Sequence, residues 1–170
     1  MVTIISGTNR LGNMTIHVSN AILELLTNDG IEAQVLDLTG LEASFISHNE
    51  AFGSASDDFT ALVTTYVQNA EKFVFVVPEY NGSYPGICKA FIDCVQPARF
   101  RGKRAAIVGL AAGRAGNLRG TDHLTGVLNY LNMEVVPKHT HLIHIDAMLE
   151  EGRLVDEHAV NMLQSQLKAL

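Results

Sequence analysis

The sequence has no apolar stretch long enough to cross a membrane. Its longest apolar run, KFVFVVP at residues 72–78, is far shorter than the roughly 20 residues that a transmembrane helix needs. The N-terminus also lacks a basic segment followed by an apolar core and a small-residue cleavage site, which is the pattern of a secretory signal. We therefore expect a soluble cytoplasmic protein that has no membrane partner.

Positive charge is also scarce. The chain has 12 Lys and Arg against 18 Asp and Glu, which gives a formal charge of -6. Nucleic-acid backbones are bound by concentrated Lys and Arg, so we expect no nucleic-acid partner. The one basic cluster, FRGKR at 100–104, is interpreted as a solvated turn ahead of a strand.

Cysteine and several well-known motifs are missing or rare. The two cysteines, Cys88 and Cys94, lie six positions apart in one predicted helix and form no C-x-x-C motif, so we interpret them as core or lining thiols. There is no P-loop, no G-x-G-x-x-G and no G-x-S-x-G nucleophile turn. These absences argue against ATP binding, a resident NAD and serine hydrolysis.

What the sequence does contain is a regular alternation of strand and helix patterns. Apolar, β-rich segments occur at 2–6, 32–38, 72–78, 103–110 and, more weakly, 134–144. Helical patterns occur at 14–28, 57–70 with Ser56 as N-cap, 85–95 opening on Pro85, 120–132 and 156–169. Uniformly apolar runs such as FVFVV indicate strands buried on both faces. We predict one α/β domain, residues 1–170, with a doubly wound, five-stranded parallel sheet in a three-layer α/β/α sandwich.

Ligands of such sheets bind beyond the carboxyl ends of the strands, which directs attention to the loops at 6–15, 78–84 and 109–119. The first loop, SGTNRLGN, precedes a helix and offers Thr8, Arg10, Asn13 and Thr15. A helix N-terminus with one guanidinium favours an anion such as a phosphate monoester. The alternative is that these residues only cap the helix and that Arg10 is solvated.

The second and third loops suggest a flat ligand. PEYNGSYPG at 78–86 must turn sharply, and Gly82 allows the backbone to approach a ligand closely. GLAAGRAGNLRG at 109–120 carries four glycines among small residues. Together the three loops predict a pocket of mononucleotide size, with an anion at the first loop and a heterocycle between the other two.

Two of these motifs resemble those of the NADPH-dependent FMN reductase family. SGTNRLGN resembles the G-S-x-R-x-x-S phosphate loop, and PEYNGSYPGICKAFIDC resembles the P-E-Y-N-x-x-x-P-G-x-L-K-x-x-x-D signature. AAGRAGNLRGTDHLTGVLNYLNMEVVP resembles the family's third loop, helix and last strand, so the likeness covers most of residues 2–137. The resemblance implies a flavodoxin-like fold, bound FMN, and transfer of hydride from NADPH or NADH to small-molecule acceptors such as flavins, quinones, azo dyes or metal oxyanions.

The resemblance also implies site residues. Thr8, Arg10, Asn13, Met14 and Thr15 would surround the FMN phosphate, Pro78, Glu79, Tyr80, Asn81, Gly82 and Ser83 would border the isoalloxazine ring, and Gly113 would belong to the loop on its other side. No catalytic acid or base is implied, because the cofactor carries the bond chemistry. Ala111 and Ala112 stand where the family has hydroxyl side chains, so FMN is expected to exchange like a substrate.

Two further hypotheses stay open for the function. One is a flavodoxin-like electron carrier without NAD(P)H reductase activity, and the other is an FMN-binding regulatory or scaffold protein. The resemblance implies a homodimer or homotetramer, and the irregular segment 39–55 is expected to line a pocket or a partner surface.

Two side-chain groups have competing interpretations. His139 and His141 share one strand face, opposite His144, and can in principle bind a metal, but nothing nearby completes a site and we expect none. Asp93 is interpreted as anchoring its loop or helix rather than performing acid chemistry.

Overall fold

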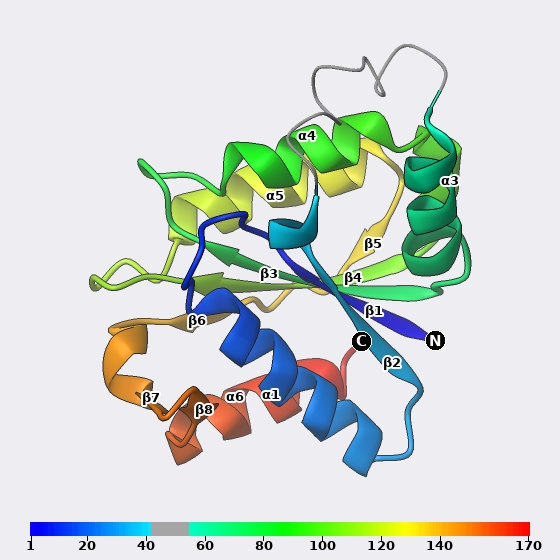
Figure 1. Cartoon of the computed structure of the whole chain (residues 1–170). Helices are drawn as coiled ribbons and strands as arrows, with labels where there is room; N and C mark the ends of the chain where they lie inside the picture. Colours follow the sequence, from blue (N-terminus) through cyan, green and yellow to red (C-terminus); the bar gives the residue numbers. More distant parts are fainter. Residues whose placement is uncertain (42–54) are drawn as a thin grey trace.

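A parallel sheet forms the centre of the computed structural model, which describes residues 1–41 and 55–170 (Figure 1). Its strands are β1 (Val2–Ser6), β2 (Ala33–Asp37), β3 (Lys72–Pro78), β4 (Arg104–Leu110), β5 (Glu134–Val135) and β6 (Thr140–Leu142). They lie in the order β2-β1-β3-β4-β5, with β6 also pairing with β4, and every pair is parallel. The predicted doubly wound, flavodoxin-like α/β fold is confirmed.

The helices cover both faces of this sheet. They are α1 (Thr15–Asn28), α3 (Asp57–Val63) continued by the π-helix η2 (Thr64–Gln68), α4 (Gly86–Cys94), α5 (Leu118–Tyr130) and α6 (Glu157–Leu167). One core cluster joins α3, η2, α4 and α5 to the sheet, and a second joins α1 and α6 to its other face. Figure 1 shows these two helical layers on opposite sides of the strands.

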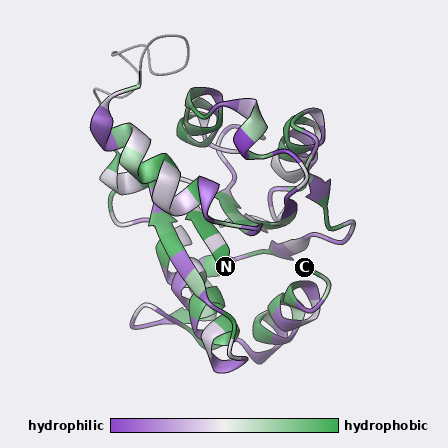
Figure 2. Ribbon diagram, turned by 90° about the vertical axis from the view of Figure 1, so that its right-hand side faces the viewer, coloured by the Kyte–Doolittle hydropathy of each residue, from purple (hydrophilic) through white to green (hydrophobic). Residues whose placement is uncertain are grey.

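The burial pattern explains why these segments became central strands. Phe73, Val74, Phe75, Val76 and Val77 of β3 are all fully buried. Alternate residues enter the two core clusters, so a strand without a solvent face can be apolar at every position. The strands are accordingly largely green on the hydropathy scale of Figure 2.

Local signals fix several of the helix starts. The Ser56 side chain accepts a hydrogen bond from the Phe59 amide at 3.2 Å, which confirms the predicted N-cap of α3. Pro85 is the N-cap residue of α4, so the helix that was predicted to open on Pro85 begins one position later, at Gly86. Asp156 caps α6 through the Ala159 amide at 2.7 Å.

The sequence-based prediction for the last strand was wrong in its extent. The segment 134–144 forms two short strands, β5 and β6, because Pro137 lies between them and lacks the N–H that a continuous ladder requires. His144 lies outside β6 in a left-handed conformation with φ of 49°. His139 also precedes the strand, so the three histidines do not share one strand.

Several short elements were not predicted. The helix expected at 57–70 is α-helical only to Val63 and then widens into η2. The 3-10 helix η4 (Ile145–Met148) is followed by a hairpin of β7 (Leu149–Glu150) and β8 (Arg153–Leu154). The segment 39–55 was expected to line a pocket or a partner surface. Its residues 42–54 lie outside the part of the chain that the structure describes. Within the described ranges, no helix is long and apolar enough to cross a membrane.

Candidate functional site

A pocket of about 210 Å³ opens at the carboxyl ends of the central strands. The loop after β1 and the start of α1 contribute Arg10, Gly12, Asn13, Met14 and Thr15 to its wall. The loop after β3 contributes Pro78, Glu79 and Tyr80, and the remaining wall consists of Leu110, Ala111, Ala112 and Ile145. In a sheet of order 2-1-3-4-5, this is the place where the strand order reverses and where ligands bind.

The end of the pocket nearest α1 has the N–H donors and the helix dipole that favour an anion. Asn13 braces the loop, since its side-chain amide donates to the Arg10 carbonyl at 2.8 Å and its oxygen accepts from the Ile16 amide at 3.0 Å. The structure gives no acceptor for the N–H groups of Met14 and Thr15 within the described part of the chain. The first turn of α1 contains no acidic residue, so the partial positive charge of the helix is not cancelled locally.

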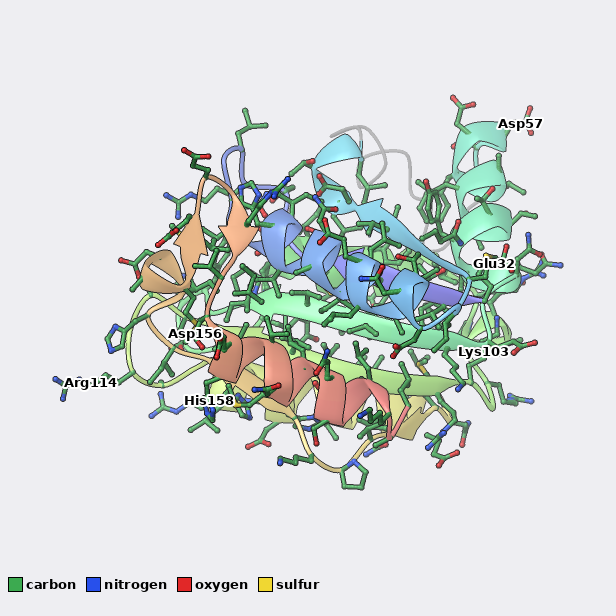
Figure 3. All side chains as sticks on the ribbon, turned by 90° about the horizontal axis from the view of Figure 1, so that it is seen from below. Glu32, Asp57, Lys103, Arg114, Asp156 and His158 are labelled. Atoms are coloured by element: carbon green, nitrogen blue, oxygen red, sulfur yellow. The ribbon has the colours of Figure 1, made fainter. Side chains whose placement is uncertain are left out.

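Arg10 adds a full positive charge to this end. Its side chain is exposed and lines the pocket, and neither ion pair found among the described residues involves it. Arg114 and Arg119, from the third loop and the start of α5, are likewise exposed and outside those two pairs. Figure 3 shows Arg114 extending away from the body of the protein. In a chain with a net charge of -6, uncompensated arginines at the carboxyl edge favour an anionic ligand.

Thr8 lies behind the pocket wall rather than on it. The residue is fully buried, and its hydroxyl is 2.7 Å from the hydroxyl of Tyr80. The same oxygen accepts a hydrogen bond from the Arg10 amide at 3.3 Å. Thr8 thus joins the first loop to the second.

The second loop turns tightly at Asn81 and Gly82. These residues have φ of 52° and 76°, and Tyr80 and Ser83 exchange both backbone hydrogen bonds, at 2.8 and 3.1 Å. This is a two-residue turn of the type that Asn-Gly favours, because both central residues need positive φ. The expected sharp turn is confirmed, and Gly82 stands where a positive φ is required.

Asn81, Gly82 and Ser83 do not form part of the pocket wall. The Ser83 hydroxyl is instead 2.9 Å from Nδ1 of His123 on α5. Gly113, which the sequence also suggested, lies on the exposed third loop outside the wall. The structure therefore brings seven of the twelve predicted site residues into one wall and places the other five beside or behind it.

The third loop supplies a small, apolar surface. Its Ala112 carbonyl is 3.0 Å from Nδ1 of His144, and the Ala111 amide donates to the Leu142 carbonyl at 3.0 Å. The Asn117 side chain donates to the Val77 carbonyl at 3.0 Å and so ties the end of the loop to β3. These bonds hold Ala111 and Ala112 against the pocket, with only methyl side chains facing it.

Sequence reasoning missed Ile145 altogether. It lies in η4, just past the end of the segment that was predicted as a strand, and it reaches the pocket only because β6 ends early at Leu142. Gly12 and Leu110 lie inside loops that were expected to form the site but carry no polar group to mark them. Their positions within the first and third loops were the only available signal.

His139 and His141 each form a hydrogen bond within the protein. His139 Nε2 is 3.0 Å from the Thr125 hydroxyl, and His141 Nδ1 is 2.8 Å from the Gly116 carbonyl. Burial, followed by the neighbouring His141, lowers the pKa of His139. Among the described residues, no group of three or more His, Cys, Asp or Glu side chains could hold a metal ion.

The two cysteines and Asp93 all belong to helix α4. Cys88 is a fully buried core residue, and burial raises the pKa of its thiol to about 12, so the reactive thiolate is suppressed at neutral pH. Cys94 is half-buried on the same helix. Asp93 pairs with Lys89, one turn earlier on α4, at 2.8 Å, which agrees with its interpretation as an anchor of the helix.

Comparison with known proteins gives consistent matches over most of the chain. Residues 1–147 match the family NADPH-dependent FMN reductase. An NAD(P)H-dependent FMN reductase of Pseudomonas aeruginosa is 31% identical over 175 residues, which cover 98% of this chain and 90% of that protein. A 2-hydroxy-1,4-benzoquinone reductase of Burkholderia is 23% identical over 170 residues, covering 96% and 90%.

A solved structure agrees with the fold. FerB of Paracoccus denitrificans, a flavoenzyme NAD(P)H:(acceptor) oxidoreductase, superposes with a TM-score of 0.80 at 22% identity. The match covers 99% of this chain and 93% of FerB. At this identity the likeness is one of fold.

Proposed function

Because the chain belongs to the NADPH-dependent FMN reductase family, we propose that its pocket binds FMN and that the protein is an NAD(P)H oxidoreductase. The electrons would pass from NADPH or NADH to a flavin, a quinone or a similar small-molecule acceptor. Named relatives that reduce FMN and a benzoquinone support this class of acceptor. When bound, FMN accepts a hydride from the reduced nicotinamide and passes the electrons on.

The observation that carries this proposal is the set of positively charged and hydrogen-bond-donating groups at the end of the pocket nearest α1. It combines the guanidinium of Arg10 with the N–H groups of Met14 and Thr15, which have no acceptor among the described residues, at the point where the strand order reverses. A phosphate monoester satisfies both kinds of donor. The neighbouring wall, from the second and third loops, is small and mostly apolar, as a flat ring requires.

Each loop has a separate role in this proposal. Arg10, Asn13, Met14 and Thr15 would hold the phosphate, and Thr8 would support them from behind. Pro78, Glu79, Tyr80, Asn81, Gly82 and Ser83 would form the loop that faces the ring, and Gly113 would belong to the loop on its other side. We assign no catalytic acid or base. The chain would orient the cofactor, exclude water from one ring face and leave the other face open to donor and acceptor.

The reduced nicotinamide cofactor is itself an anion, which the exposed arginines favour. Arg114 belongs to the third loop. Arg119, at the start of α5, lies beside the second loop, since its Nη1 atom is 3.6 Å from the place that a Cβ on Gly82 would occupy. They are suited to the phosphates of NADPH or NADH near the ring end. Steady-state assays with NADPH and with NADH, on the wild-type protein and on Arg119→Ala, would show which phosphate of the nicotinamide cofactor the arginine contacts.

We also propose that the protein is a homodimer or homotetramer. Leu11, Met14 and Leu118, which flank the pocket in the first loop and at the start of α5, have exposed fractions of 87%, 40% and 55%. Contiguous exposed apolar patches mark interaction sites, and we propose that these three side chains belong to a patch that a second subunit covers. Light scattering tests this proposal, since a fully active monomer at micromolar concentration would refute it.

The proposed function is tested by titrating the purified protein with FMN and with riboflavin, followed by assays of NADPH and NADH oxidation with a benzoquinone as acceptor. We expect FMN to bind more tightly than riboflavin, and nicotinamide oxidation to depend on added FMN. A protein that binds neither flavin would refute the proposal. One that binds FMN but oxidises neither nicotinamide would be an electron carrier or a regulatory protein.

A further inference from the structure

We propose that the hydrogen bond between the hydroxyls of Thr8 and Tyr80 couples the anion end of the pocket to the second loop. In this proposal Thr8 is a positioning residue, which acts on the ring site through Tyr80. The inference rests on the proposed function, because it assumes a phosphate at one end of the pocket and a flavin ring at the other.

The chain brings the two residues together although 72 positions separate them. After β1, the Gly7 amide donates to the Val76 carbonyl at 2.8 Å, so the first loop stays against the end of β3. A Cβ on Gly7 would lie 2.8 Å from Val77 Cγ1 and 2.9 Å from the Val76 oxygen, which only glycine avoids. Thr8, the next residue, therefore lies beside the loop that follows β3.

The Thr8 hydroxyl is already engaged by two partners within the protein. The residue is fully buried, and the hydroxyl already contacts Tyr80 and accepts from the Arg10 amide. A hydroxyl has one donor and two acceptor positions, so it can serve both partners at once. The result is a continuous path from the backbone of Arg10 through Thr8 to the Tyr80 side chain.

Tyr80 transmits this contact to the ring loop. Its side chain lines the pocket, and its backbone N–H and C=O both bond Ser83 across the turn. A shift of the Arg10 backbone on anion binding would change the position of Thr8 and then of Tyr80. In this proposal the shift favours the position of Tyr80 that binds the ring, so phosphate strengthens ring binding. Because coupling between two binding sites is reciprocal, the ring then strengthens phosphate binding by the same factor.

The coupling can be measured with riboflavin and inorganic phosphate as separate probes of the two ends. Riboflavin affinity is titrated with and without phosphate, using potassium chloride at equal ionic strength as the reference. The variants are Thr8→Val, Tyr80→Phe, the double variant, and Thr8→Ser, which restores a hydroxyl. Thr3→Val is the matched control. Thr3 lies in β1 and is also fully buried, and its hydroxyl accepts a hydrogen bond from the Gln34 side chain at 3.0 Å.

In the wild-type protein and in Thr3→Val we expect phosphate to strengthen riboflavin binding by about fivefold, the lower end of typical coupling. The effect should vanish in Thr8→Val and in Tyr80→Phe, should not fall further in the double variant, and should return in Thr8→Ser. Thermal melting identifies any variant that has lost its fold, and Tyr80→Phe then supplies the test independently of Thr8→Val.

Two results would overturn the coupling while leaving the proposed function intact. One is a phosphate effect that is absent from a wild-type protein that binds FMN, and the other is an effect of equal size in the folded variants. Loss of FMN affinity in Thr8→Val with no loss in Tyr80→Phe would also overturn it, because Thr8 would then bind the phosphate itself. Failure of the wild-type protein to bind any flavin would instead overturn the proposed function.

Discussion

The two ends of the pocket present different chemistry to a ligand. At the α1 end, Arg10 and the N–H groups of Met14 and Thr15 offer charge and hydrogen-bond donors. At the end formed by the third loop and η4, the wall is made of Leu110, Ala111, Ala112 and Ile145, with no polar side chain among them. Both ends are held by hydrogen bonds, but only one of them offers its polar groups to a ligand.

This difference suggests how affinity and turnover are divided. Hydrogen bonds to a charged group contribute about 1.5–3 kcal/mol each, whereas contact with a methyl group contributes much less. The cofactor would therefore be retained mainly through its phosphate, while its ring stays loosely held. Loose retention of the ring agrees with the expectation that FMN exchanges like a substrate.

The largest expected effect is the loss of charge at the α1 end. Arg10→Ala should weaken FMN binding by roughly 10- to 100-fold, because one charge-assisted hydrogen bond is removed. Riboflavin binding should hardly change, since riboflavin has the same ring without the phosphate. Arg101→Ala, in the exposed turn ahead of β4, is the control. Equal losses for both flavins would mean that Arg10 supports the ring or the loop.

A smaller effect, but one common to both flavins, is expected in the second loop. Gly82→Val places a branched side chain at a φ of 76°, a strain of about 1–3 kcal/mol that the turn would relieve by changing shape. FMN and riboflavin should both lose affinity by about tenfold or more, with little change in melting temperature. Gly102→Val is the matched control, because Gly102 has a φ of 75° with open space around it and lies far along the chain from the site.

Adding negative charge beside the phosphate position should separate binding from stability. Met14→Glu places a carboxylate at the N-terminus of α1, which stabilises a helix by about 0.3–1 kcal/mol, so the melting temperature should hold or rise. The same charge repels a phosphate, and FMN affinity should fall by about tenfold. Met14→Gln is the neutral control. If the Glu and Gln variants bind FMN equally, the phosphate does not lie at this helix end.

The smallest effect is a gain at the apolar end. Ala112→Ser adds a hydroxyl to the pocket wall, and one neutral hydrogen bond contributes about 0.5–1.5 kcal/mol. FMN and riboflavin should both bind a few times more tightly and dissociate more slowly. Ala115→Ser, on the same exposed loop but outside the wall, should have no effect. Unchanged affinity in Ala112→Ser would show that the ring does not approach this wall.

The sequence predicted the parts of the fold that depend on burial alone. β1 and β3 have the bounds that their sequence patterns predicted, because a strand covered on both faces is mostly apolar, although β1 also buries Thr3 and Ser6. The turn at Asn81 and Gly82 was equally clear, since few other dipeptides accept two positive φ values. The strands were predictable from local hydrophobicity, and the turn was predictable from the residues that accept a positive φ.

The remaining parts depend on contacts between distant segments. Pro137 was visible in the sequence, but its effect in dividing β5 from β6 depends on both strands pairing with β4. Thr8 was expected at the phosphate because it is a short donor in the first loop, which resembles the family's phosphate loop. Its bond to Tyr80 depends on the packing of Gly7 against β3, which the sequence does not show. Ile145 had no local signal at all.

The central claim is that this protein reduces bound FMN with NADPH or NADH, and anaerobic rapid mixing of the FMN-loaded protein with each nicotinamide tests it most directly. The account predicts that the absorbance of oxidised flavin disappears in one two-electron step, at a rate that rises with nicotinamide concentration, and that a benzoquinone restores it. Flavin that stays oxidised with both nicotinamides, yet accepts single electrons from a chemical reductant, would contradict the account and identify an electron carrier.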